Sequence, residues 1–295
     1  MKRTLNPHLM MAVSMAIFGT IPLFVRNISV SSGELALYRA ILATFLIGIF
    51  LLITKQKILF LKIKKEVPLL VISGVAVGIN WILLFEAYKY TTVSVATLSY
   101  YFAPVIVTVL SPIIFKEKLT VKQIVCFAMS TLGLVLITGI GGAGAGEDFI
   151  GILFGLGAAL FYATAVLLNK FTKQVDGIHR TFLQFVSAVV VLIPYVLMTS
   201  GVTLSGLDGK GWVNLFVVGI VHTGITYCMY FSSLKDLPGQ KAAILSYIDP
   251  LVAVLISVTV LGESMTASQL IGGALILGFT LLDSISFKTK KLSDK

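Results

Sequence analysis

Charged residues are scarce in this sequence: they make up 12% of its 295 residues, whereas hydrophobic residues make up 57%. Soluble globular domains carry about 25% charged and roughly 45–50% apolar residues. So few charges cannot cover a water-exposed surface, which excludes an ordinary soluble domain. We therefore expect an integral membrane protein whose main partner is the lipid bilayer.

Several chemical motifs are also missing. The two cysteines, Cys126 and Cys228, stand singly in apolar segments, which excludes a disulfide framework and a cysteine metal site. The sequence contains no GxxxxGK[ST] loop for ATP, no HExxH, no GxSxG and no second histidine near His222. We expect no cofactor, no metal site and no catalytic residue. The chain is not predicted to be an enzyme, and any transport must draw on an external gradient.

Apolar runs of membrane-spanning length are present instead. A hydrocarbon core about 30 Å thick requires about 20 apolar residues per helix, and lipid offers no partners for free backbone groups. The runs are 8–26, 34–54, 67–88, 93–115, 121–140, 149–169, 180–200, 212–233, 241–261 and 267–287. The sequence therefore predicts an all-α polytopic membrane protein with ten transmembrane helices.

Basic residues are distributed unevenly between the two sides of these spans. Of the 23 lysines and arginines, 19 flank one side, and four flank the other: Arg26, Arg39, Lys89 and Lys210. Basic flanks stay in the cytoplasm, so we expect a multi-pass protein of the cell (inner or plasma) membrane with both termini cytoplasmic. The same scatter between spans excludes a nucleic-acid-binding stripe.

The chain repeats itself at an offset of 146 residues. Without gaps, Tyr101 aligns with Tyr247, Pro104 with Pro250, and Glu117 with Glu263. We expect a first five-helix repeat at 1–140, a Gly-rich linker at 141–148 and a second five-helix repeat at 149–295. The glycines at 139–144 match GxGxxG by chance, because no βαβ unit surrounds them.

Five spans are an odd number, so the second repeat must enter the membrane from the opposite side. Inverted repeats are typical of secondary transporters that work by alternating access, with the substrate site near the midplane where the halves meet. This architecture predicts a small-molecule substrate as a second partner.

The segments that close the two halves carry a family resemblance. They read "PVIVTVLSPIIFKEKLT" (104–120) and "DPLVAVLISVTVLGESMT" (249–266), each followed three residues later by Gln. With ten spans, this pattern resembles the EamA-type transporters of the drug/metabolite transporter superfamily over nearly the whole chain. The resemblance implies an inverted-repeat bundle in the inner membrane that moves amino acids or similar small metabolites, often outward.

Polar residues found in both repeats are expected to serve the shared fold. Pro104 and Pro250 are expected to kink their helices toward the interior. Glu117 and Glu263 each precede a threonine that can cap the next helix, so they are interpreted as structural corners.

Polar residues found in one repeat only are candidates for coupling. Asp249 aligns with Ala103 and lies near the midplane, where a carboxyl is costly and usually functional. It is the first candidate for carrying protons; the alternative is a protonated carboxyl bonded to a neighbouring hydroxyl. His222 aligns with Ala76 and is the second candidate, with a packing histidine as its alternative.

Aromatic and polar side chains at membrane depth are candidates for binding substrate. Arg39 can grip a carboxylate with its two-pronged donors, or else extend to the headgroups or pair with Glu34. Ordinary helix packing is the alternative for the others. The full set of substrate candidates is Asn80, Trp81, Tyr101, Thr226, Tyr227, Tyr247 and Arg39.

Together these features predict a secondary transporter of small polar or amphipathic metabolites, such as amino acids, that exports them by alternating access coupled to protons. The alternatives are an uncoupled facilitator of small solutes and a membrane scaffold or sensor that transports nothing. A phosphorylated substrate is disfavoured, because cations within the spans are few.

Overall fold

The computed structural model describes residues 6–285 except 57, 59–62, 117, 139–146, 176 and 235. Within this part of the chain every regular element is a helix. Glu117 and most of the expected linker 141–148 lie outside the described residues.

The first repeat contains α1 (Pro7–Gly19), α2 (Ile21–Val25), α3 (Ser32–Ile53), α5 (Val67–Tyr90), α6 (Val93–Tyr100), α7 (Ala103–Phe115) and α8 (Val121–Thr138). The second repeat contains α9 (Glu147–Asn169), α10 (Gly177–Met198), the 3₁₀ turn η1 (Leu204–Gly206), α11 (Gly209–Phe216), the π-helix η2 (Val217–Ile225), α12 (Thr226–Leu234), α13 (Gly239–Ser246), α14 (Ile248–Thr259) and α15 (Ala267–Ser284).

These helices confirm the predicted ten crossings. In the described part of the chain, nine helical segments are long and apolar enough to span a membrane, and a shorter apolar helix at Ile244–Thr259 supplies the tenth. The helices begin and end within about three residues of the predicted runs, since the length of an apolar run is set by the thickness of the hydrocarbon core.

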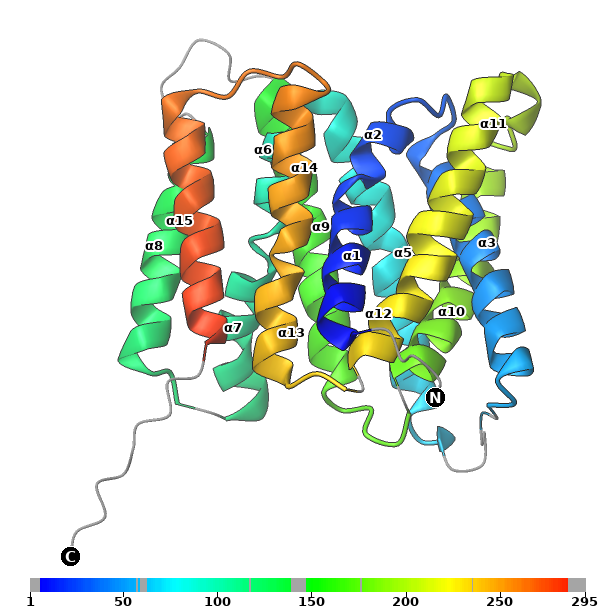
Figure 1. Ribbon diagram of the computed structural model, residues 1–295, viewed down its shortest axis with the longest axis horizontal. Helices are drawn as coiled ribbons and strands as arrows, with labels where there is room; N and C mark the ends of the chain where they lie inside the picture. The colour runs from blue at the N-terminus through cyan, green and yellow to red at the C-terminus, as the bar shows by residue number, and fades with distance from the viewer. Residues whose placement is uncertain are drawn as a thin grey trace, which may run out of the picture.

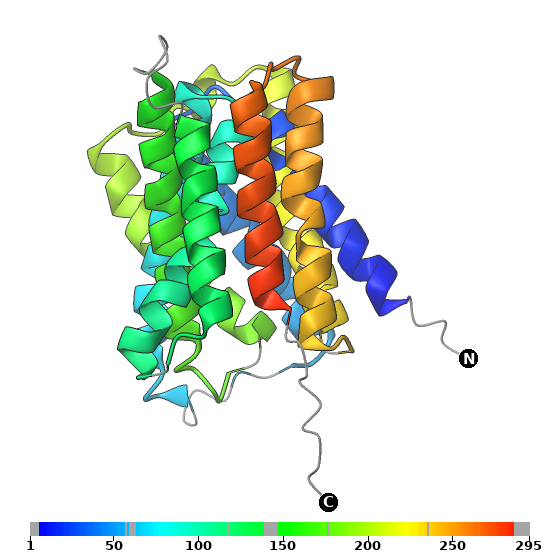
Figure 2. The ribbon, with the colours of Figure 1, turned by 90° about the vertical axis from the view of Figure 1, so that its left-hand side faces the viewer.

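Successive crossings run in alternating directions. In Figure 1, α1 rises from the lower face and α15 descends to it, so the two described ends of the chain lie at the same face. The side view in Figure 2 agrees, and there α1 is tilted against the other helices. Because each repeat has five crossings, α9 enters from the face opposite to α1, and the two repeats are inverted.

The repeats are interleaved rather than set side by side. The extensive helix contacts pair one repeat with the other: α5 with α9 and α10, α8 with α15, α3 with α10 and η2, and α1 with α12 and α14. A transport site between the repeats can therefore draw side chains from most of the helices.

Two crossings are broken at equivalent points. The fourth crossing breaks at Tyr101–Phe102 between α6 and α7, and the ninth breaks at Tyr247 between α13 and α14. The prolines predicted to kink these crossings, Pro104 and Pro250, lie in the first turn of α7 and α14. The first turn tolerates proline because its backbone N–H groups have no partner within the helix.

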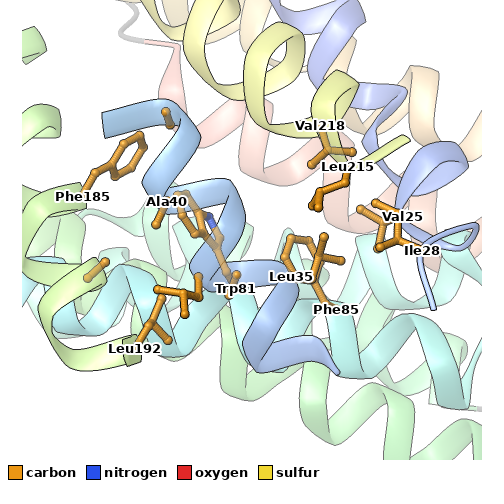
Figure 3. Packing of buried hydrophobic residues seen from close by; sticks show 14 of the residues in the cluster. Val25, Ile28, Leu35, Ala40, Trp81, Phe85, Phe185, Leu192, Leu215 and Val218 are labelled. Carbon is orange, nitrogen blue, oxygen red and sulfur yellow. The ribbon is translucent and has the colours of Figure 1, made fainter. Parts of the chain in front are cut away.

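The largest buried apolar cluster in the described part of the chain gathers residues mainly from α3, α5, α10 and η2. Figure 3 shows its central residues: Val25, Ile28, Leu35, Ala40, Trp81, Phe85, Phe185, Leu192, Leu215 and Val218. Trp81 of this cluster also contacts Arg39, which is described below.

Small residues permit close contact between α8 and α15. A Cβ atom at Gly272 of α15 would collide with the backbone carbonyl of Gly133 in α8, and a Cβ at Gly133 would collide with that of Gly272. Such close approach is typical of small residues between membrane helices.

We predict that Gly272→Ala destabilises the protein by about 1–3 kcal/mol, because the added methyl group meets backbone and forces α8 and α15 apart. Gly278→Ala in the same helix is the matched control, since a Cβ at Gly278 meets nothing within 4 Å. The melting temperature of purified protein in detergent measures both. Equal melting of the two variants would contradict the close contact.

Candidate functional site

Asp249 and Tyr101 meet at the two helix breaks. Tyr101 occupies the break between α6 and α7, and Asp249 is the second residue of α14. The Tyr101 hydroxyl donates a hydrogen bond of 2.5 Å to Oδ2 of Asp249. This distance is at the short end for an O–H···O bond, as expected when the acceptor is a carboxylate. One residue comes from each repeat, so the bond joins the two halves.

Arg39 of α3 brings a positive charge to the same region. Its side chain is buried, Nε donates a 2.7 Å hydrogen bond to the hydroxyl of Thr223, and Cζ lies 4.4 Å from the ring centroid of Trp81. Among the described residues, its two terminal nitrogens have no hydrogen bond and no carboxylate lies within ion-pair range. The guanidinium therefore presents an unused pair of donors.

The alternatives considered for Arg39 do not hold in this structure. Its burial excludes extension to the headgroups. Glu34 does not pair with it, because the Glu34 carboxylate accepts hydrogen bonds from the hydroxyl of Tyr38 and from the backbone N–H and hydroxyl of Thr203.

A short series of contacts connects Asp249 to Arg39 across the repeat boundary. The backbone carbonyl of Asp249 packs against Gly19 of α1, the next residue Thr20 lies 2.7 Å from His222, and Thr223, which follows His222, accepts the hydrogen bond from Arg39. Tyrosine rings adjoin the Asp249–Tyr101 pair, since Tyr100 contacts both Tyr101 and Tyr162 at centroid distances of 5.6 Å. A buried charge without a close partner costs several kcal/mol. The region is therefore suited to a ligand that carries charges of its own.

Aromatic rings line up beside these charges. Trp81 contacts Phe185 at a centroid distance of 5.0 Å, Phe185 contacts Tyr227 at 5.3 Å, and Tyr227 contacts Phe18 at 5.0 Å. Trp81 and Tyr227 occupy equivalent positions in the two repeats, and the fold brings both into one row of rings.

His222 is bonded at both ring nitrogens. Nε2 lies 2.7 Å from the Thr20 hydroxyl, and Nδ1 lies 3.1 Å from the carbonyl of Val217. His222 belongs to the π-helix η2, a geometry often found at functional sites. In the described structure it shares no hydrogen bond with Asp249, and its contacts fit a packing histidine that joins α1 to η2.

Three other sequence candidates share no hydrogen bond with Asp249 or Tyr101 in the described structure. Asn80 donates a 2.6 Å hydrogen bond to the carbonyl of Ala158, and Thr226 donates to the carbonyl of Val221. The hydroxyl of Tyr247 lies beside Thr280 and Ser284 of α15, and the position equivalent to Asp249 in the first repeat is Ala103, which has no carboxyl. These contacts favour packing roles for the three residues.

A second polar cluster fastens the face opposite to the chain ends. Arg26 forms an ion pair with Glu263, and Glu263 also accepts hydrogen bonds from the Ser257 hydroxyl and the backbone N–H of Val93. We name Arg26, Val93, Ser257 and Glu263 the Glu263 cluster. It ties the end of α2, the start of α6 and the end of α14 together.

The Glu263 cluster extends the structural corner expected from the sequence. Gly262 has a positive φ of 67°, as a tight turn requires, and Thr266 caps α15 in a capping box with Gln269. The ion pair with Arg26 is an addition that sequence reasoning missed, because Arg26 was considered only as a flanking charge.

Other partners were also missed. Thr223 bonds Arg39, Thr20 bonds His222, and Phe185 links Trp81 to Tyr227. Threonine and phenylalanine are ordinary residues in membrane helices, so composition and spacing contain no signal that would have selected these three.

Comparison with known proteins agrees with this architecture. A model of the EamA-like transporter family matches residues 5–139 and 149–284. The uncharacterized transporter YxxF of Bacillus subtilis (strain 168) is 32% identical over 268 residues, which cover 90% of this chain and 85% of the relative. An uncharacterized transporter of Archaeoglobus fulgidus is 32% identical over 66% of this chain and 68% of its own.

Two more distant similarities extend the comparison. A Salmonella typhimurium protein described as a probable amino-acid metabolite efflux pump is 24% identical over 82% of this chain and 85% of its own. A crystal structure with 17% sequence identity has the same fold, with a TM-score of 0.64 over 94% of this chain and 96% of that chain. The family match covers both halves, and the relatives are described as transporters. The chain is therefore a multi-pass membrane transporter, not an enzyme, and it belongs to the EamA-like transporter family of the drug/metabolite transporter superfamily.

Proposed function

We propose that this transporter exports small polar or amphipathic metabolites, such as amino acids, in exchange for protons by alternating access. The proposal places it in the cell membrane with both termini in the cytoplasm. The hydrogen bond between Tyr101 and Asp249 is the observation that carries it.

The depth of Asp249 supports a role in coupling. Counted from Gly239 to Thr259, α13 and α14 form one crossing, and Asp249 stands in its middle. An ionised carboxyl there costs at least about 2.5–3.5 kcal/mol on insertion scales, so retained ones usually work in transport. A neutral asparagine would fill the same space at lower cost.

The bond's position between the repeats supports alternating access. An ionised Asp249 accepts the Tyr101 hydroxyl proton across the boundary, whereas a protonated Asp249 has one fewer lone pair to offer and a proton of its own to donate. The protonation of Asp249 thus changes a hydrogen bond between helices of the two repeats, α14 and the break between α6 and α7. No ATP-binding loop is present in the sequence, so a gradient supplies the energy.

Direction and substrate class rest on two further observations. The Glu263 cluster fastens the face opposite to the chain ends, which under the proposed orientation is the outer face, as expected of an exporter that loads from the cytoplasm. The Salmonella typhimurium relative is described as a probable amino-acid metabolite efflux pump, which favours amino acids or related compounds.

We predict that Asp249→Asn abolishes substrate-driven proton flux, because the amide keeps the shape of the carboxyl but cannot exchange a proton. Purified protein in liposomes with an internal pH dye, an imposed proton gradient and pools of amino acids or other metabolites measures this flux. Asp208→Asn is the matched control: Asp208 caps α11, and asparagine caps equally well.

Each other outcome has a definite meaning. Proton flux in Asp249→Asn equal to that of native protein would make Asp249 structural. Tracer flux without proton flux in native protein would establish an uncoupled facilitator. Absence of both for every pool would favour a scaffold or sensor that does not transport.

We also predict that Arg26 and Glu263 are energetically coupled by about 0.5–3 kcal/mol in a double-mutant cycle of Arg26→Gln and Glu263→Gln. Their ion pair is partly shielded, with side-chain exposures of 31% and 9%. The exposed ion pair of Lys89 and Glu86 is the control and should couple by only about 0.2–0.5 kcal/mol. Unfolding free energies in detergent give both values, and equal coupling of the two pairs would refute a fastening role.

A further inference from the structure

The guanidinium of Arg39 is held by protein groups on one side, and its terminal nitrogens are left to bind a ligand. Thr223 holds Nε and the face of Trp81 supports the plane, so the side chain is fixed in one orientation. The two terminal nitrogens have no hydrogen bond among the described residues. Parallel N–H donors of this kind match the two oxygens of a carboxylate.

Asp249 offers the complementary charge from the other repeat. Its Oδ2 accepts the Tyr101 hydroxyl, and its backbone carbonyl packs against Gly19, whose neighbour Thr20 lies 2.7 Å from His222, next to the Thr223 that holds Arg39. In the described part of the chain, the titratable side chains that sense the charge of Asp249 are Arg39 and five tyrosines: Tyr88, Tyr100, Tyr101, Tyr162 and Tyr227. A ligand with one positive and one negative group can satisfy both repeats at once.

We propose that Arg39 binds the α-carboxylate, and Asp249 the α-ammonium group, of a zwitterionic amino acid. This inference rests on the proposed function and names its substrate class. The ammonium group and a proton then compete for the Asp249 carboxylate. Each change between the inward-open and outward-open states therefore carries either an amino acid or a proton. Competition of this kind yields exchange, whereas a substrate bound through its carboxylate alone would favour a protonated Asp249 and travel with the proton.

The adjoining rings indicate which side chains fit. Trp81, Phe185, Tyr227 and Phe18 form a continuous apolar row beside the charges. The row favours amino acids with aromatic or branched apolar side chains, since polar ones would lose hydration without gaining partners.

Trp81 provides a direct binding assay. The chain has two tryptophans, Trp81 and Trp212. Trp212 packs on Phe216 in α11, whereas the ring contacts of Arg39 in the described structure are with Trp81 and Phe85. In full-length Trp212→Phe protein, the fluorescence of Trp81 alone reports binding beside Arg39. The probes are L-phenylalanine, L-leucine, L-phenylalaninamide, which lacks the carboxylate, and 3-phenylpropanoate, which lacks the ammonium group.

We expect phenylalanine or leucine to change the Trp81 signal saturably, with affinity that falls on acidification. 3-Phenylpropanoate should bind more tightly on acidification, and the amide should bind at least tenfold more weakly than phenylalanine. In Asp249→Asn, the affinity for either ligand should no longer change with pH. Arg39→Gln should weaken phenylalanine binding at least tenfold, whereas Lys210→Gln, which removes an exposed cation, should change nothing.

If Arg39→Gln does not fold, Arg39→Lys replaces it in the test. Lysine keeps the positive charge but lacks the paired N–H donors of the guanidinium, so this variant should also bind phenylalanine at least tenfold more weakly. The proposal is overturned if the amide binds as tightly as phenylalanine, if either Arg39 variant binds normally, or if neither amino acid binds. If the proposal fails but another solute pool drives proton flux in liposomes, the proposed proton-coupled export still stands. If no pool drives proton flux, both the amino-acid site and the proposed export are contradicted.

Discussion

One hydrogen bond, from Tyr101 to Asp249, joins the two repeats in the middle of the membrane. Lipid has no donor or acceptor to offer, so a carboxyl at this depth is tolerated only where protein supplies a partner. The helix breaks deliver the two side chains to each other, and the interleaved packing keeps lipid away. Other polar groups are also bonded across the boundary, notably Arg39 to Thr223 and Arg26 to Glu263. Neither repeat is complete alone.

The duplication explains which positions are polar in both halves and which are not. Threonine caps and prolines after the breaks recur because each inverted copy needs the same turns. A bound molecule has no reason to obey the symmetry. In the alignment at an offset of 146 residues, Asp249 corresponds to Ala103, and Arg39 corresponds to Phe185. The two charges proposed to bind substrate thus appear once each.

The fold could be predicted from the sequence because apolar run length and the offset of 146 residues are local, readable patterns. The partner of Asp249 could not, since Tyr101 lies 148 residues away and its hydroxyl is chemically like those of many other tyrosines. Tyr101 and Tyr247 are equivalent in the alignment, yet in the described structure only Tyr101 donates a hydrogen bond to a carboxylate. The ion pair of Arg26 with Glu263 was hidden for the same reason: contacts between repeats depend on packing, not on spacing.

Coupling through Asp249 is tested most directly by counting protons released when a ligand binds. Weakly buffered purified protein with a pH-indicator dye is mixed with L-phenylalanine or L-leucine at a series of starting pH values that extends into the acidic range where binding weakens. Competition for one carboxylate predicts release of up to about one proton per bound amino acid and none from Asp249→Asn. Binding without release, or equal release from the variant, would contradict it.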